Sequence, residues 1–125
     1  NGIVFPQVNY VEGKKAKEIL FSTENLVKTG LTFVQGATAI EAGTIIGIIT
    51  ATGKATAYKT GNTDGSELPI GVALEDIDVV AGDALGNVAI AGILLKDALV
   101  GYDAGAKTAL GAVELNLGGT AVVKL

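Results

Sequence analysis

The chain has 125 residues, 49% of them hydrophobic, a net charge of −4, and no Cys, His, Met or Trp. This length suits one domain with its own core, and without Cys or His the chain cannot build disulfides, nitrogen or sulfur metal sites, or thiol or imidazole catalysis; we expect no metal and no cofactor. All nine positive charges are Lys, and a chain without Arg and with net negative charge is not expected to bind nucleic acid.

Residues 1–17 are predicted to form an extended arm, followed by a β-rich domain over residues 18–125. The arm is richer in apolar side chains than a solvated tail usually is, and such a segment suits strand addition to another chain. A solvated tail is the alternative. The candidate anchors are Ile3, Val4, Phe5, Val8, Tyr10 and Val11. The cluster of Lys14, Lys15 and Lys17 is expected in solvent, with contact to phosphate or an acidic protein face as the alternative.

The first part of the domain contains two expected strands. Residues 19–21 favour a short strand, although Ser22 or Thr23 could instead cap a brief helical turn. Residues 31–36 alternate in polarity, which predicts a second strand.

The segment 42–53 is β-branched and bounded by glycines. Its isoleucines do not alternate, so both faces of the strand are expected to be buried. Gly47 within it indicates a bend, a bulge or close backbone packing. A tight connection at Thr52 and Gly53 should then lead into a strand over residues 54–59.

Six of the thirteen carboxylates lie in residues 61–83, beginning with turn residues over 61–65. The next strand places Ile70, Val72 and Leu74 on one face. The apolar positions then slip by one residue, which indicates a bulge or a strand end near residues 75–76. Asp76 and Asp78 should therefore face solvent. Residues 81–86 are expected to form a turn.

The rest of the chain is predicted to contain a strand from residue 87 that ends in a loop or helical turn, and a closing strand over residues 120–125. Residues 102–119 are ambiguous, with one or two helical turns over 104–110. Seven or eight short strands separated by glycine turns predict an all-β domain with minor helix, built as a small barrel or sandwich.

Each candidate for a chemical site has a simpler explanation. Asp76, Asp78 and Asp83 could hold a cation, but the spacing fails the EF-hand pattern and solvent-facing acids fit better. Carboxylate pairs alone do not make a glycosidase, and no glycine loop continues as a P-loop. Lys54 and Lys59 lack the setting of a biotinyl or lipoyl lysine. No apolar run reaches the about 20 residues that span a bilayer and no secretory signal is visible, so no membrane association is expected.

Three pieces of the chain, in order, resemble the lambda-type head decoration proteins of tailed bacteriophages. They are "AGTIIGIITATGKATAY", "DGSELPIGVALEDIDVVAGD" and "VAIAGILL", and together they span residues 42–95. Each piece is a modest motif alone, whereas the ordered set is fairly specific. The first 30 residues and the residues after 101 match less clearly.

The resemblance implies a small barrel-like fold, called a β-tulip in this family, and no catalysis. It implies a homotrimer that binds the major capsid protein at threefold positions outside the expanded head and stabilises the head against the pressure of its DNA. The protein would be assembled in the host cytoplasm and become part of the virion. By position, residues 1–17 would be the segment that orders on the coat.

Two questions stay open at the level of sequence. The apolar residues Ile93, Leu94, Leu95 and Leu99 are candidates for the trimer interface, with packing in the monomer's own core as an equal alternative. A non-catalytic ligand- or carbohydrate-binding module from a larger protein is the competing function, and it would need an exposed platform made by Tyr10, Tyr58 or Tyr102.

Overall fold

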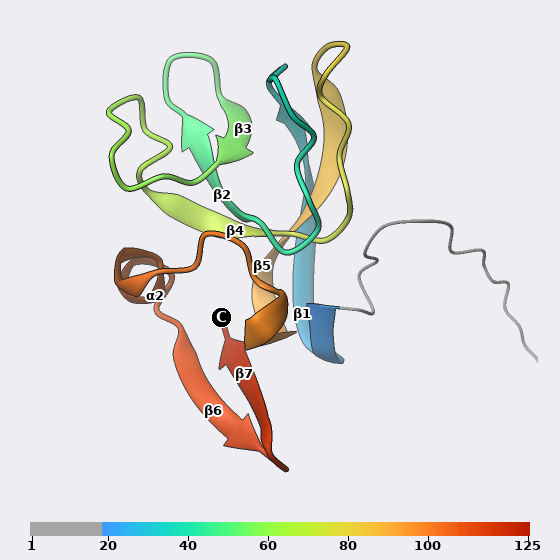
Figure 1. Ribbon diagram of the computed structural model, residues 1–125, viewed down its shortest axis with the longest axis vertical. Coiled ribbons are helices and arrows are strands. Elements are labelled where there is room, and N and C mark those ends of the chain that lie inside the picture. The colour runs from blue at the N-terminus through green and yellow to red at the C-terminus, as the bar shows by residue number, and fades with distance from the viewer. Residues whose placement is uncertain (1–18) are drawn as a thin grey trace, which may run out of the picture.

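The computed structural model of the protein describes residues 19–125, which form strands, one short helix and one 3-10 turn (Figure 1). No helix in this part of the chain is long and apolar enough to cross a bilayer. The elements in chain order are β1 (Leu20–Phe33), β2 (Ile45–Ile49), β3 (Lys54–Ala57), β4 (Pro69–Ala73), β5 (Ala84–Leu95), η1 (Lys96–Ala98), α2 (Ala104–Leu110), β6 (Val113–Leu117) and β7 (Thr120–Lys124).

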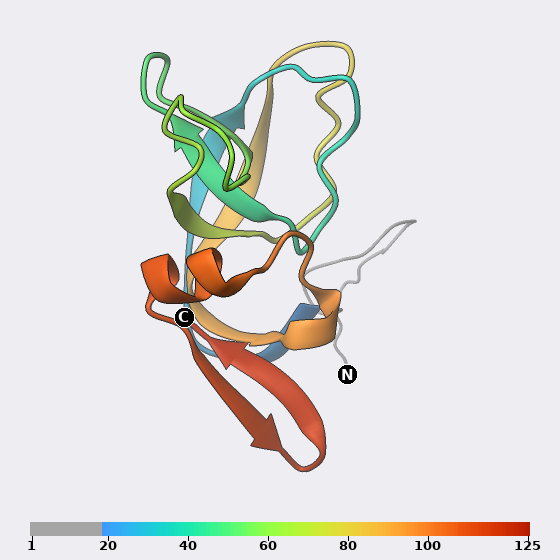
Figure 2. The same ribbon diagram turned by 60° about the vertical axis from the view of Figure 1, so that its left-hand side comes forward.

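Five of the seven strands close into a barrel. The sheet order is β1-β3-β2-β4-β5-β7-β6, and β1 pairs with β5 as well as with β3. The pairing of β1 with β5 therefore joins the two ends of the five-stranded part. The β6–β7 hairpin continues from β5 and projects away from the barrel in both views (Figures 1 and 2). The predicted all-β class, with minor helix, is confirmed.

β5 belongs to both parts of the molecule because its partner changes along one of its edges. On one edge it pairs with β1 from Ala84 to Leu94, whereas on the other edge β4 pairs with Val88 and Ala89 and β7 pairs with the last three residues. On the edge shared with β1, the β1 residues Val27 and Lys28 are adjacent but pair with Ala91 and Ala89. Ile90 is thus the extra residue of a β-bulge, and bulges bend a strand and increase its twist. The bend lets one strand close the barrel and then leave it.

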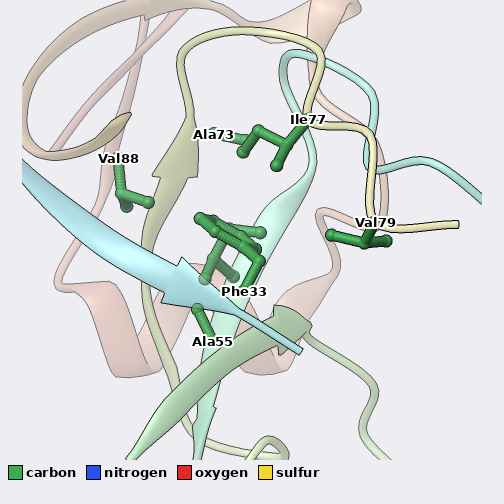
Figure 3. Close-up of a cluster of buried hydrophobic side chains, with 7 residues drawn as sticks. Phe33, Ala55, Ala73, Ile77, Val79 and Val88 are labelled. Atoms are coloured by element: carbon green, nitrogen blue, oxygen red, sulfur yellow. The ribbon is translucent and has the colours of Figure 1, made fainter. Parts of the chain in front are cut away.

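The barrel is filled by one cluster of apolar side chains (Figure 3). Phe33, the largest fully buried side chain, packs with residues from β2, β3, β4, β5 and the segment after β4. The members of the cluster are Phe33, Ile46, Ala55, Ala73, Ile77, Val79 and Val88. Phe33 is also the β1 residue that pairs with Ala55 of β3. The same residue therefore fills the core and takes part in the strand pairing that closes the barrel.

A second cluster lies against α2, on the other face of β2. Ile45 and Ile46 are adjacent in sequence and belong to different clusters. Successive strand residues point to opposite faces, so β2 separates two cores, as its non-alternating isoleucines predict. The members of the second cluster are Ile45, Tyr58, Val72, Leu94 and Ala106.

Gly47 allows the loop before β4 to lie directly on β2. A Cβ at this position would stand 2.5 Å from the carbonyl oxygen of Ser66, closer than atoms can approach. The register between β2 and β4 also shifts between Ile46 and Gly47. Close packing and a bulge, two of the roles predicted for this glycine, therefore occur together.

Some predicted boundaries are wrong. The strands expected at 19–21 and 31–36 are parts of the single strand β1, and the turn expected over 81–86 ends where β5 begins, at Ala84. Both errors arise because β1 and β5 pair with each other from Leu20↔Leu94 to Phe33↔Ala84, and this pairing extends strands through residues of low strand propensity. The slip near residues 75–76 marks a strand end, since β4 stops at Ala73.

Replacing Phe33 with Ala should destabilise the protein by about 3–5 kcal/mol, because it leaves a cavity in the barrel core. The matched control is Phe21→Ala on the same strand, where the ring is 42% exposed and the loss should be about 1 kcal/mol or less. Urea unfolding followed by circular dichroism measures both. Similar losses for the two variants would contradict the assignment of Phe33 to the core.

Candidate functional site

The first two acids of the stretch over residues 61–83, Asp64 and Glu67, bond to groups of their own loop. Asp64 accepts hydrogen bonds from the backbone N–H and the hydroxyl of Ser66, at 3.0 and 2.5 Å. These bonds, that of the hydroxyl first, lower the pKa of Asp64. Glu67 accepts a bond from the backbone N–H of Gly65 at 2.8 Å. These acids are turn residues, as their neighbours in the sequence predict.

The three candidate cation ligands do not converge. Asp76 accepts from the backbone N–H of Ala42, and Asp78 from that of Val80. Asp83 accepts from Gln35 and is paired with Lys54, and the bond from Lys54 is the main cause of its lowered pKa. Within residues 19–125, no three acidic side chains are grouped closely enough to hold a metal.

A polar cluster lies where α2, η1 and β6 meet. Glu114 of β6 accepts hydrogen bonds from Lys96 at 3.1 Å and from the hydroxyl of Tyr102 at 2.9 Å, with Lys107 at 4.0 Å. The bond from Lys96, then that from Tyr102, lowers the pKa of Glu114. Burial and the bond to Glu114 raise the pKa of Tyr102 to about 12. The open hollow at this cluster is thus lined by charges that already pair with one another.

The described tyrosines do not form a platform for sugars. Tyr58 is buried, and its hydroxyl donates to Asp103 at 2.9 Å. Asp103 also caps α2 by accepting from the backbone N–H of Ala106, so this pair attaches the helix to the barrel. Tyr102 is half-buried with its hydroxyl bound to Glu114. Tyr10 lies outside the described residues. Nothing in the described chain favours the carbohydrate-binding alternative.

The four candidates for a trimer interface are divided by the fold. Leu94 is fully buried in the cluster beneath α2, so its side chain has no surface to offer a partner. Ile93 and Leu95 are half-buried and pair with Lys124 and Val122 of β7. Leu99 is half-buried against the same cluster as Leu94. The six candidate anchors of the arm, residues 3–11, and the lysines at 14–17 lie outside the described residues.

The sequence was compared with models of known protein families. The model of the bacteriophage lambda head decoration protein D family matches residues 9–117. The chain belongs to this family. Membership agrees with the resemblance carried by residues 42–95 and extends it in both directions. The head decoration proteins are structural components of phage capsids and are not a known enzyme family. A search of individually curated proteins found no significant match.

The closing strand predicted over residues 120–125 is β7, but β6 is absent from the predicted elements, and with it the β6–β7 hairpin of this decoration protein. Its signal is nevertheless present in the sequence: "VELNLGGTAVVKL" places Gly118 and Gly119 between two runs rich in strand-forming residues. A Gly-Gly pair in that position is typical of a two-residue hairpin loop. Both glycines have positive φ, 59° and 84°, as such a loop requires.

The lowered pKa of Glu114 makes its stabilising effect dependent on pH. A carboxylate with a depressed folded-state pKa stabilises the fold above its unfolded pKa, about 4.3, and loses that effect as the pH falls through the folded value. Glu114→Gln should therefore be less stable than the native chain at pH 7, and the difference should shrink below about pH 4.3. Urea unfolding at several pH values measures this difference.

The matched control is Glu41→Gln, at an exposed glutamate of the loop before β2. It should change stability little at any pH, since surface substitutions away from paired groups usually have small effects. If the deficit of the Glu114 variant stayed constant or grew on acidification, the pairing of Glu114 with Lys96 and Tyr102 would not be a source of folded-state stability.

Proposed function

We propose that this decoration protein binds as a homotrimer at threefold positions on the outside of the expanded phage head and stabilises the head against the pressure of its DNA. The observation that carries the proposal is family membership across residues 9–117. The chemistry of the described residues supports it, because the charged side chains of the clusters described above bond to the protein itself. Such a protein acts by attaching surfaces to one another.

Attachment to a shell suits a small protein whose individual contacts are weak. Many copies act on the same capsid, and each trimer would engage it through three equivalent contacts. Linked contacts bind far more tightly than single ones. No contact therefore needs the size of a stable two-protein interface, which usually buries about 1,200–2,000 Å².

Residues 1–17 are proposed to be the segment that contacts the coat protein, with residues 18–125 as the folded domain. An extended segment can add a strand to a neighbouring sheet, where backbone bonds supply affinity and alternate side chains fill pockets. Phe5, Val8 and Tyr10 are the largest apolar candidates for such pockets.

The proposed trimer contact includes Ile93, Leu95 and Leu99. Ile93 and Leu95 lie opposite Lys124 and Val122 of β7, and these in turn lie opposite Val113 and Leu115 of β6. Residues directly opposite in a sheet share a face. The side chains therefore share one mainly apolar face. Val122 is fully buried in it, whereas Ile93, Leu95, Val113 and Leu115 keep part of their surface accessible to a neighbouring copy.

The native protein should bind expanded, undecorated heads of the matching phage stoichiometrically and saturably, with copies in multiples of three. The heads should also retain DNA to a higher temperature once decorated, because the added subunits hold the coat proteins together. Sedimentation measures binding, and release of DNA on heating measures stabilisation. Failure to bind any matching expanded head would refute the proposal, whereas binding without stabilisation would refute only its mechanical part.

Replacing Phe5, Val8 and Tyr10 together with Ser should weaken binding to heads at least about tenfold. Burying an apolar side chain contributes about 1.5 kcal/mol or more, and 1.4 kcal/mol corresponds to a factor of ten. The matched control replaces Lys14, Lys15 and Lys17 with Ser, which removes charge from the same arm and should change affinity much less at physiological salt. Equal affinity of the apolar variant and the native chain, both folded by circular dichroism, would rule out the arm as the anchor.

A further inference from the structure

Among residues 19–125, no strand pairs with the outer edge of β6. All five residues of β6 are exposed, and its pairing with β7 runs from Val113↔Lys124 to Leu117↔Thr120 without a register shift. Natural edge strands are usually protected by Lys, Pro or bulges. β6, with the sequence Val-Glu-Leu-Asn-Leu, has no Lys, no Pro and no bulge, and its one charged side chain, Glu114, is bonded to Lys96 and Tyr102. An edge of this kind is a template for strand pairing.

The geometry of the hairpin shows which backbone groups are available. In a two-residue loop the residues on either side exchange a backbone hydrogen bond, here Leu117 and Thr120. Bonded and non-bonded pairs then alternate along an antiparallel ladder. Val113, Leu115 and Leu117 therefore direct their N–H and C=O groups toward β7. Glu114 and Asn116 direct theirs toward the open edge.

The side chains divide in the same way. Glu114 lies toward η1 and α2, where it meets Lys96 and Tyr102. The side chains of Val113, Leu115 and Leu117 point to the opposite face of the hairpin. They form an apolar row, with exposed fractions of 52%, 37% and 39%.

We propose that β6 pairs antiparallel with β6 of a second copy, about a twofold axis at Leu115. In this register the edge-facing backbone groups of Glu114 bond to those of Asn116 in the second copy, and those of Asn116 bond to those of Glu114 in the second copy. It places the Asn amide, a donor, beside the Glu carboxylate, an acceptor. A shift that set Glu114 against its own copy would oppose like charges, which is destabilising. The chosen register also sets Leu115 against Leu115 and Val113 against Leu117, giving an apolar row of six side chains.

This contact differs from the proposed trimer, because a twofold interface uses one surface on both copies whereas a threefold ring needs two different surfaces. It would join copies that belong to neighbouring trimers. A pair of five-residue strands is far smaller than a stable interface, so the contact is weak in dilute solution. It becomes significant at the about millimolar local concentrations that tethering provides.

The test uses single cysteines, since the chain has none of its own. In the proposed register Leu115 faces itself as a non-hydrogen-bonded pair, with Cα atoms about 4.5 Å apart, within the range of a disulfide. Leu117, with nearly the same exposure, lies four residues from its counterpart, about 13 Å away. Under mild oxidation at about 1 mM protein, Leu115→Cys should form disulfide-linked dimers at least about tenfold faster than Leu117→Cys. Equal rates, or a faster Leu117 variant, would overturn the proposal.

Amide hydrogen exchange of the native chain is a second readout. As protein concentration rises, the amides of Glu114 and Asn116 should become protected, while that of Leu115, already bonded to β7, should not change. Protection that appears only when heads are added, with no dimer of the Leu115 variant, would overturn the proposal in favour of a coat-protein strand on this edge. Binding to heads is measured separately by sedimentation, so failure here leaves the proposed function intact.

Discussion

The pairing between β1 and β5 is the interaction on which the rest of the structure depends. It closes the barrel. Without it the strands would form an open sheet, in which β1 would be one edge and β5 would pair only with β4 and β7. Closure removes the unpaired strand edges that invite association and encloses Phe33 on all sides. The same strand β5 then bends at Ile90 and carries β7 and β6 outside. Within residues 19–125, the barrel strands therefore pair on both sides, whereas β6 at the end of the sheet pairs on one side.

The features that the sequence predicts correctly are those set by neighbouring residues. The isoleucines of residues 45–49 predict a strand buried on both faces, and Gly47 predicts close backbone packing. The helical turns that the ambiguous segment allows over 104–110 are the helix α2. The boundaries of β1 and β5 could not be read locally, since polar residues near the middle of β1 are held in the strand by pairing with β5, far away in the chain. Local propensity cannot report such a pairing.

The candidate surfaces show the same limit. Sequence reasoning finds the apolar group at the end of β5, but it cannot say that Leu94 lies inside and Ile93 and Leu95 outside, because that depends on how β5 bends. The exposed face of β6 was missed because its alternation is short and two of its five residues are polar. Its turn signal, Gly118-Gly119, was the stronger indication.

The chemistry of the described residues fits a protein that acts by contact. Asp64, Asp83, Asp103 and Glu114 have lowered pKa values caused by hydrogen bonds to the protein's own backbone, hydroxyl or lysine groups. Such groups stabilise loops and a helix end. Membership in the head decoration family indicates that these contacts are made on the phage capsid.

The barrel is thus proposed to stay closed on the capsid, while attachment is made by residues 1–17 and by the face formed by the end of β5 with β7 and β6. Electron cryomicroscopy of expanded heads decorated with this protein tests this division of roles. We expect three copies around each threefold position, with the barrel unchanged, residues 1–17 on the coat protein and the outer face of β5–β7–β6 toward neighbouring copies. Copies bound singly through the barrel wall, or a barrel opened between β1 and β5 on the capsid, would contradict it.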